Sequence, residues 1–179
     1  MTYVALLRAI NLAGRNRVAM SALRDFAVTL QLEVPQTLLQ SGNLVFRSRA
    51  RADALERQLE AEVKAHLGLE IDFFVRSASE WASIVARNPF KNEAKRDPGH
   101  LIAVLLKDPP GRARTAALQA AIVGREVVRV DGRHAYIVYP DGQGRSRLTN
   151  TLIEKTLGTR GTARNWNTVL KLGSVMAAI

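Results

Sequence analysis

The residues best suited to chemistry lie close together near the C-terminus, in the segment 158–168. This segment holds two Gly, two Arg, two Asn, three Thr and one Trp. Guanidinium groups, hydroxyls and the free amides of a helix start are the groups that bind a phosphate. We therefore expect Arg164, Asn165 and Asn167 to contact such a ligand, with Asn165 also serving as the N-cap of the last helix. The same residues would suit a capped helix start that binds nothing.

A glycine-rich turn at 139–147 is the second candidate, because it follows a predicted strand and leads into a predicted helix over about 147–157. Arg145 and Arg147 are expected in the first turn of that helix. Cations there oppose the helix dipole, at a cost of about 0.3–1 kcal/mol each unless an anion is bound. Arg145 and Ser146 are thus candidate ligand contacts. The alternative is a Pro-Asp-Gly turn with two solvated arginines.

Polar residues also end the first predicted strand, at Arg8 and Asn11. We expect both to point into the cleft that holds the glycine-rich turns, although a strand often ends simply where it reaches solvent. Asn43 is predicted to be a turn residue with an unusual backbone angle rather than a ligand contact. Tyr136 and Tyr139 fall on opposite faces of one strand, so one is expected to be exposed for stacking on a base.

Signatures of catalysis are poor in this chain. It has no Cys, and its three His are predicted to be isolated, with neither metal-ligand spacing nor a carboxylate partner. It lacks the Gly-x-Ser-x-Gly nucleophile elbow, the P-loop spacing and the third Gly of a dinucleotide fingerprint. We expect no metal and no cofactor.

Charge is the strongest feature of the composition. The 26 Lys and Arg against 16 Asp and Glu give a net charge of +10. Residues 1–110 hold 15 basic and 12 acidic side chains, whereas residues 111–179 hold 11 and 4. This balance favours an anionic partner near the C-terminal half, such as a phosphate-bearing ligand or a nucleic acid. A simply Arg-rich, solvated surface would give the same totals.

Hydropathy patterning indicates a chain that does not enter a membrane. No apolar run approaches the ~20 residues that a membrane-spanning helix needs. The first seven residues lack the basic segment and cleavage site of a signal peptide, and they are typical of a first strand. We expect a cytoplasmic protein with no membrane partner; the sequence predicts no oligomeric state.

The predicted elements repeat one βαββαβ order, which is the split βαβ, or ferredoxin-like, arrangement. The first set comprises strand 3–8, a helix capped by Ser21, strands 37–40 and 44–47 joined by a Ser-Gly-Asn turn, a helix through 55–63, and strand 71–75. A helix opened by a capping box of Ser77 and Glu80 connects the two sets. The second comprises strand 101–106, helix 112–122, strands 126–130 and 134–139, helix 147–157, and an extended piece before a terminal helix that starts at Trp166.

The sequence thus predicts an α+β protein of two duplicated ferredoxin-like halves, with antiparallel-rich sheets and a C-terminal helix. The halves are predicted over residues 1–77 and 100–179, joined by a connecting helix and loop at 78–99. Trp166 is expected in the core rather than as a stacking platform.

Several longer motifs carry a family resemblance. They are Leu7-Arg8-Ala9-Ile10-Asn11, Gln40-Ser41-Gly42-Asn43-Leu44-Val45-Phe46, Asn88-Pro89-Phe90, the turn Tyr139 to Ser146, and Thr162 to Val169. On these motifs the chain resembles the bacterial family known as domain of unknown function 1697, from residue 3 to about 172. The resemblance implies an α+β fold of two ferredoxin-like halves. It implies no activity and no catalytic residues.

Together these features favour a protein that binds a phosphate-bearing ligand, either a nucleotide or a nucleic acid. The expected contacts are Arg8, Asn11, Arg145, Ser146, Arg164, Asn165 and Asn167. One alternative is an enzyme acting on a phosphorylated small molecule, with Asp141 as acid or base. Another is an interaction or scaffold module whose polar motifs only form turns and caps.

Overall fold

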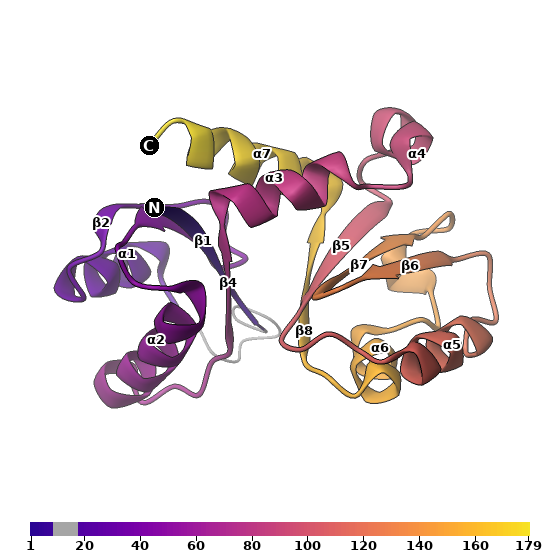
Figure 1. Cartoon of the computed structure of the whole chain (residues 1–179), viewed down its shortest axis with the longest axis horizontal. Helices are drawn as coiled ribbons and strands as arrows, with labels where there is room; N and C mark the ends of the chain where they lie inside the picture. The colour runs from indigo at the N-terminus through magenta and orange to yellow at the C-terminus, as the bar shows by residue number, and fades with distance from the viewer. Residues whose placement is uncertain (9–17) are drawn as a thin grey trace. The chain divides into compact units, whose positions relative to one another are not determined.

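The computed structural model describes residues 1–8 and 18–179. These residues form two four-stranded antiparallel sheets and seven α-helices (Figure 1). The chain divides into two compact units. The first is Met1–Ser83 together with Lys171–Ile179, and the second is Ile84–Leu170. The strands of each sheet and the helices between them follow the same order along the chain. This repeat confirms the predicted α+β class and the duplication.

The first unit follows a βαββαβ order with strands arranged β2-β3-β1-β4. Its elements are β1 (Thr2–Leu7), α1 (Met20–Thr29), β2 (Glu33–Thr37), β3 (Asn43–Arg47), α2 (Ala52–Leu67) and β4 (Phe73–Ser77), followed by α3 (Ala78–Ala86). Helices α1 and α2 cover one face of this sheet (Figure 1). Alternate β1 residues Tyr3, Ala5 and Leu7 pack there in one apolar cluster with Leu55 and Leu59 of α2, as the two-residue period of a strand requires.

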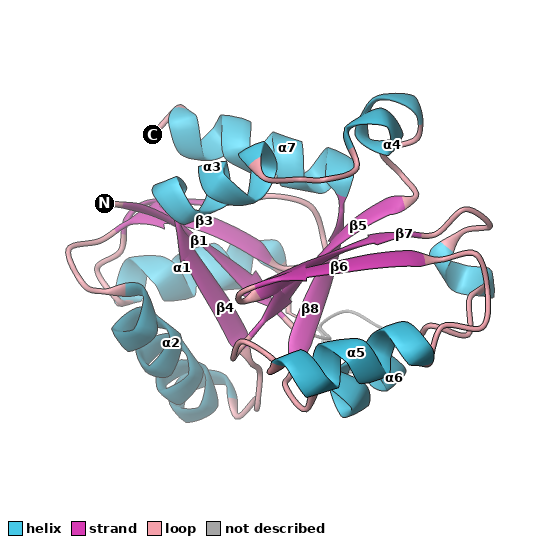
Figure 2. Ribbon diagram, turned by 45° about the vertical axis from the view of Figure 1, so that its right-hand side comes forward, coloured by secondary structure: helices cyan, strands magenta, loops and turns pink. Residues whose placement is uncertain are grey.

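The second unit repeats this order with strands arranged β6-β7-β5-β8. Its elements are α4 (Lys91–Arg96), β5 (Leu101–Leu106), α5 (Arg112–Ala120), β6 (Val127–Asp131), β7 (His134–Val138), the 3-10 turn η1 (Gln143–Arg145), α6 (Asn150–Leu157), β8 (Gly161–Asn165) and α7 (Trp166–Ala177). Helices α5 and α6 lie together on one face of the sheet (Figure 2). Leu118 of α5 and Ile153 of α6 are buried there against Val104 and Ile137.

The opposite face of the second sheet is also covered. Tyr136 is 1% exposed, and its hydroxyl donates to the carbonyl of Ile84 at 2.7 Å. Its ring lies 6.2 Å from that of Trp166, which is itself buried. The core position of Trp166 is confirmed. The expected exposed tyrosine is wrong, because Tyr139 on the other face is equally buried.

The hairpin of the first unit differs from its prediction. Strand β2 lies earlier than the predicted strand 37–40, and the loop between Thr37 and Asn43 is longer than the predicted Ser-Gly-Asn turn. Asn43 is fully buried at the start of β3, and its Nδ2 donates to the carbonyl of Leu38 at 2.6 Å. The positive φ angles fall on Leu39 and Gly42 instead. Asn43 therefore closes the loop through its side chain and not through an unusual backbone angle.

The two predicted helix caps of the first unit have different outcomes. Ser21 is not a cap, because α1 begins one residue earlier and no side chain caps it. The capping box is confirmed: the Ser77 amide donates to Glu80 Oε2 at 2.8 Å, and the Glu80 amide donates to Ser77 Oγ at 3.3 Å.

Among the helices described, none combines the length and the apolar character that a membrane crossing demands.

Candidate functional site

The glycine-rich turn after β7 does not lead directly into a helix, which overturns one expectation. Helix α6 begins at Asn150, and Thr149 is its N-cap, with Oγ1 accepting the amide of Leu152 at 3.2 Å. Arg145 ends the turn η1, and Arg147 lies in the segment before the cap. Neither arginine sits in the first helical turn, so the helix dipole gives no argument for an anion here.

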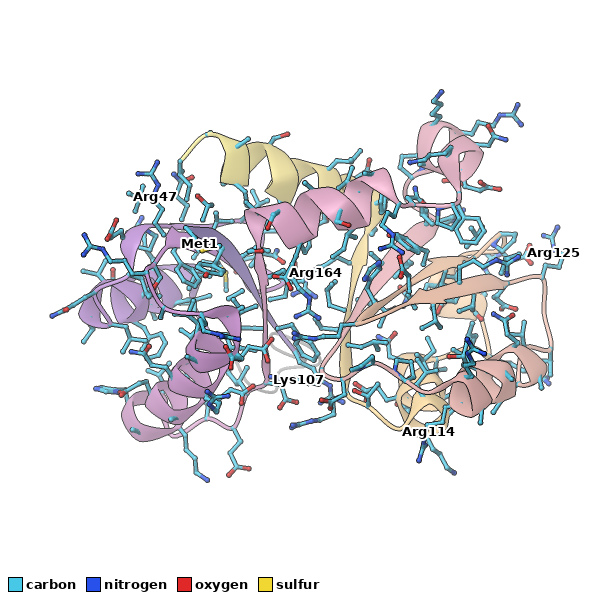
Figure 3. The ribbon with its side chains drawn as sticks, viewed as in Figure 1. Met1, Arg47, Lys107, Arg114, Arg125 and Arg164 are labelled. Atoms are coloured by element: carbon cyan, nitrogen blue, oxygen red, sulfur yellow. The ribbon has the colours of Figure 1, made fainter. Side chains whose placement is uncertain are left out.

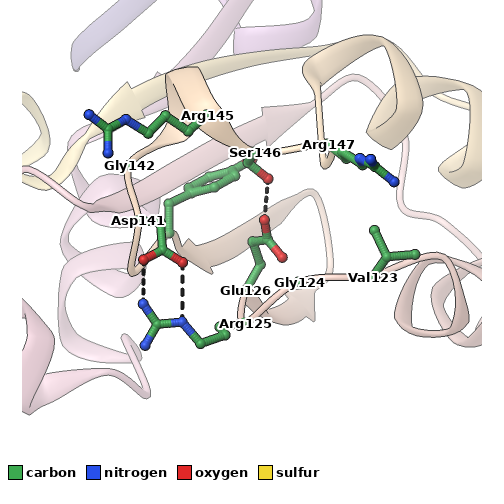
Figure 4. Close-up of a pocket in the computed structure, with 10 residues that line it drawn as sticks. Val123, Gly124, Arg125, Glu126, Asp141, Gly142, Arg145, Ser146 and Arg147 are labelled. Carbon is green, nitrogen blue, oxygen red and sulfur yellow. Dashed lines mark hydrogen bonds and ion pairs between the residues drawn. The ribbon is translucent and has the colours of Figure 1, made fainter.

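The same turn nevertheless forms one wall of a pocket in the second unit. The cavity has a volume of about 280 Å³ (Figure 4). It combines the turn after β7 with the segment that leads into β6. Its lining residues are Val123, Gly124, Arg125, Glu126, Tyr139, Asp141, Gly142, Arg145, Ser146 and Arg147. The pocket thus gathers three guanidinium groups and two carboxylates.

One of these arginines is already paired. The Arg125 guanidinium donates to both Asp141 carboxylate oxygens, with Nε at 3.1 Å from Oδ2 (Figure 4). This hydrogen bond lowers the pKa of the Asp141 carboxyl below its usual value, with further help from the nearby charges of Arg125, Arg145 and His100. Asp141 is therefore ionised at neutral pH, and Arg125 neutralises its charge.

The second carboxylate of the pocket is held by Ser146. The Ser146 hydroxyl donates to Glu126 Oε1 and accepts the amide of Leu148 at 2.9 Å. The Glu126 carboxylate also folds back over Gly124, where an added Cβ would collide with it. Ser146 is therefore a structural link between the two walls, and its hydroxyl proton is directed at Glu126 and not at the cavity.

The other two arginines of the pocket have no such partner. In the described residues, the side chains of Arg145 and Arg147 make no hydrogen bond and no ion pair. Both are exposed, and they extend to either side of Ser146 (Figure 4). Because no protein group fixes them, each guanidinium is free to turn toward an anion in the cavity.

Tyr139 contributes an apolar wall with a fixed hydroxyl. Its side chain is buried, and the hydroxyl donates to the carbonyl of Leu148 at 3.0 Å. Burial raises the pKa of this phenol well above its ordinary value. Tyr139 therefore stays neutral and positions the segment that carries Arg147.

Arg164 lies in β8 and not among the residues that line the pocket (Figure 3). It is 7% exposed, and its Nη1 donates to Thr162 Oγ1 at 2.9 Å and to the carbonyl of Ala163 at 2.8 Å. Burial lowers the pKa of its guanidinium to about 10. Arg76 occupies the matching position in β4, and its Nη1 likewise donates to the preceding carbonyl, that of Val75. The same bond in both halves favours a structural role.

The remaining predicted contacts are placed as follows. Asn165 is confirmed as the N-cap of α7, with Oδ1 accepting the amide of Thr168 at 2.9 Å. Asn167 is exposed in the first turn of α7 and does not line the pocket. Arg8 belongs to the first unit, where its Nη1 lies 3.9 Å from Asp72 Oδ2. Asn11 lies outside the described residues. Of the predicted contacts that the structure describes, only Arg145 and Ser146 line the pocket.

The expectation of isolated histidines is wrong. His66 lies 3.2 Å from Glu62, and His134 lies 3.6 Å from Asp131. The shortest pair joins His100 Nδ1 to Asp97 Oδ2 at 2.6 Å. Each acid precedes its histidine by three or four residues, a spacing that was visible in the sequence. Within residues 1–8 and 18–179, no three side chains of metal-ligating type gather as a metal ion would require.

Sequence analysis missed Arg125 and Glu126, which form the wall opposite the glycine-rich turn. They lie 16 and 20 residues before their partners Asp141 and Ser146. The hairpin register was the available signal. Strands β6 and β7 pair Asp131 with His134 and Val127 with Val138, so residues just before β6 must approach residues just after β7.

Comparison with known proteins gives the family of the chain. The model of the family described as "Protein of unknown function (DUF1697)" matches residues 1–136. The chain belongs to this family. Among solved structures, the conserved bacterial protein SP0830 from Streptococcus pneumoniae is similar to the DUF1697 chain with a TM-score of 0.78. The two are 21% identical over 98% of each chain, which establishes a shared fold. No curated protein matches the chain.

Proposed function

We propose that the second unit binds a small phosphate-bearing ligand, such as a nucleotide, in the pocket lined by Arg145 and Arg147. The observation that carries the proposal is the contrast among the three pocket arginines. Arg125 is neutralised by Asp141, whereas the side chains of Arg145 and Arg147 form no hydrogen bond and no ion pair in the described part of the chain. Guanidinium groups bind phosphate oxygens through paired, charge-assisted hydrogen bonds.

The size of the cavity supports a small ligand. Pockets for small molecules usually measure roughly 300–1,000 Å³, and this one is close to the lower end at about 280 Å³. A phosphate with a compact organic group would fill it. Gly144 in the turn leaves the backbone accessible, since a Cβ built on it would have no neighbour within 4 Å.

The enzyme alternative that uses Asp141 as acid or base has less support. Its bond to Arg125 lowers the pKa of Asp141 and keeps the carboxyl ionised, whereas a general acid needs a pKa near the working pH. The scaffold alternative predicts that neither Arg145 nor Arg147 affects any ligand.

A binding measurement with inorganic phosphate, monomethyl phosphate and AMP tests the proposal. The probes are titrated by calorimetry into the wild-type chain and the variants Arg145→Gln and Arg147→Gln. Each substitution removes one charged contact, so affinity should fall roughly tenfold. Both side chains are exposed, so the variants should keep the wild-type melting temperature.

Arg112→Gln is the matched control, because Arg112 is an exposed arginine of the same unit that does not line the pocket. It removes the same charge from the chain and should leave affinity nearly unchanged. If all three substitutions weaken binding equally, the effect is one of overall charge. If the wild-type chain binds none of the probes, the proposed function is wrong.

A further inference from the structure

A histidine–aspartate pair lies next to the pocket and has no part in the function proposed above. His100 precedes β5, and its Nδ1 lies 2.6 Å from Asp97 Oδ2 at the end of α4. The pair is reinforced by a backbone bond, in which the His100 amide donates to the Asp97 carbonyl at 3.1 Å. The ring is thus held by its Nδ1 side, and its orientation is set.

The other ring nitrogen lies beside Gly142 of the pocket wall, and His100 itself stands just outside the residues that line the cavity. A Cβ built on Gly142 would lie 3.6 Å from His100 Nε2, and Gly142 itself lines the pocket. The carbonyl of His100 accepts the amide of Tyr139 at 2.9 Å, which fixes the ring beside the turn. Among the described residues, no group forms a hydrogen bond with Nε2. Gly142 lies on the Arg145 side of the pocket (Figure 4).

We propose that His100 is a third ligand contact of this pocket, oriented by Asp97, and that it makes the pocket selective for the dianion of a terminal phosphate. The inference rests on the proposed function and deepens it. When protonated, the ring donates from Nε2 to a phosphate oxygen. The selected ligand class is a phosphomonoester rather than an internal phosphodiester.

The charge balance of the site supports this choice. Arg125 and Asp141 neutralise each other, so Arg145, Arg147 and a protonated His100 remain to face an anion, against the one further carboxylate of the pocket, that of Glu126, which Ser146 holds. A phosphomonoester carries up to two negative charges and three free oxygens, whereas a phosphodiester carries one charge and two. The charged groups next to the ring are Asp97, which it contacts, and Asp141, with which it interacts electrostatically.

Sulfate tests the histidine without interference from titration of the ligand, because it stays dianionic across the range in which histidines exchange their proton, about pH 5 to 8. Binding is measured by NMR titration at constant ionic strength near both ends of that range. The wild-type chain should bind sulfate roughly three- to tenfold more weakly at the high end, where the ring is neutral. His100→Gln should bind weakly at both ends and show no such change.

Asp97→Asn tests the positioning role. The amide still fits beside the ring, but it holds Nδ1 less firmly than the carboxylate does. Sulfate affinity should therefore fall toward that of His100→Gln, while the melting temperature stays near that of the wild type. A residue with only a structural role would change the melting temperature and leave sulfate affinity in place.

The wild-type chain supplies a readout that needs no substitution. It has three histidines, so three imidazole Cε1–H signals are expected, and the one lost in His100→Gln identifies His100. Sulfate should move that signal and leave those of His66 and His134 in place. Monomethyl phosphate should also bind several-fold more tightly than dimethyl phosphate.

The outcomes separate the two proposals. If sulfate and monomethyl phosphate bind and depend on Arg145 and Arg147, but the His100 signal and the pH profile do not respond, the inference about His100 is wrong and the proposed function stands. Equal affinity for monomethyl and dimethyl phosphate would also overturn the selectivity. If no anion binds to the wild-type chain, both proposals fail together.

Discussion

Three arginines line one pocket, and they differ in whether a carboxylate already neutralises them. Arg125 and Asp141 satisfy each other, so this pair shapes the wall without offering charge to a ligand. Arg145 and Arg147 lack such a carboxylate in the described residues. Arg164 is buried and bonded to its own strand. Residue type alone therefore does not distinguish these arginines; their partners do.

The Arg125–Asp141 pair predicts a pH effect of definite sign. Its hydrogen bond lowers the pKa of the folded-state carboxyl, so its contribution to stability is present above the unfolded-state pKa and is lost as pH falls through the folded-state value. In Arg125→Gln the pKa of Asp141 should rise toward the ordinary range. Carboxyl carbon shifts followed by NMR during an acid titration measure this.

Arg129→Gln is the control for that titration, because Arg129 lies in the same hairpin and its Nη1 donates to the carbonyl of Val128 and not to Asp141. This variant should leave the midpoint of the Asp141 acid titration at its wild-type value. Equal midpoints in Arg125→Gln and the wild-type chain would contradict the pairing.

At the scale of single elements, each half ends in a strand that turns directly into a capped helix. Ser77 caps α3 after β4, and Asn165 caps α7 after β8. Arg76 and Arg164 are the residues just before these caps and make the same backbone bond. The C-terminal polar motif is thus a repeated junction between strand and helix, and its polar atoms are largely engaged in that junction.

Substituting the two asparagines of α7 separates a cap from a surface residue. Asn165→Ala removes the acceptor for the Thr168 amide, so it should lower the free energy of unfolding by about 1 kcal/mol. Asn167→Ala changes an exposed side chain two residues later and should alter the free energy of unfolding by less than about 0.5 kcal/mol. Urea denaturation measures both. Equal losses would mean that the cap does not stabilise α7.

The sequence predicted elements well where apolar runs have clear ends. Strand β5 has the predicted bounds, Leu101–Leu106, because it is apolar throughout and buried on both faces. Helix α6 was placed too early, since apolar spacing does not reveal that Thr149 bonds Leu152 and sets the start. Strand β2 was placed too late, because Pro35 in its centre is unfavourable in a strand and its residues are mostly exposed.

The candidate site was only half predictable, for a related physical reason. The glycine-rich turn with Arg145 and Ser146 is local, and composition reveals it. Arg125 and Glu126 reach it only through the pairing of β6 with β7, and the His100 ring reaches it because its carbonyl bonds Tyr139. Side-chain pairing at these distances follows from strand register, which single-sequence patterns fix weakly.

At the scale of the whole molecule, helix α7 is shared between the two units. Its residues up to Leu170 belong to the second unit, and those from Lys171 onward belong to the first. The last segment of the chain therefore completes the unit that contains the N-terminus. Within that unit, Gly173 packs on Trp81 of α3, where an added Cβ would lie 3.6 Å from the indole ring.

This division predicts that two nearby core substitutions act on different units. Val169 and Leu172 are both fully buried in α7. Leu172→Ala should cost about 2–5 kcal/mol and lower the hydrogen-exchange protection of β1 and β4. Val169→Ala removes two methyl groups, should cost about 2 kcal/mol, and should affect β5 and β8 instead. Loss of protection in the same strands for both variants would contradict the division.

Net charge at this scale also creates a competing way to bind anions. An excess of ten basic side chains attracts any polyanion, and such binding weakens steeply with salt because it depends on released counterions. Nucleic-acid binding of this kind would depend on surface charge and not on the pocket. A single affinity for DNA or RNA therefore carries no information about Arg145 and Arg147.

The salt dependence of binding to a double variant distinguishes anion binding in the pocket from anion binding to the basic surface. Arg145→Gln with Arg147→Gln should abolish binding of monomethyl phosphate, yet short DNA should still bind, with a salt slope reduced by about two at most, since each lost phosphate contact contributes about one. Calorimetry at several salt concentrations measures both ligands. If instead the double variant loses DNA binding entirely while small phosphates bind neither protein, the two arginines serve a nucleic acid, and the small-ligand proposal is replaced by that function.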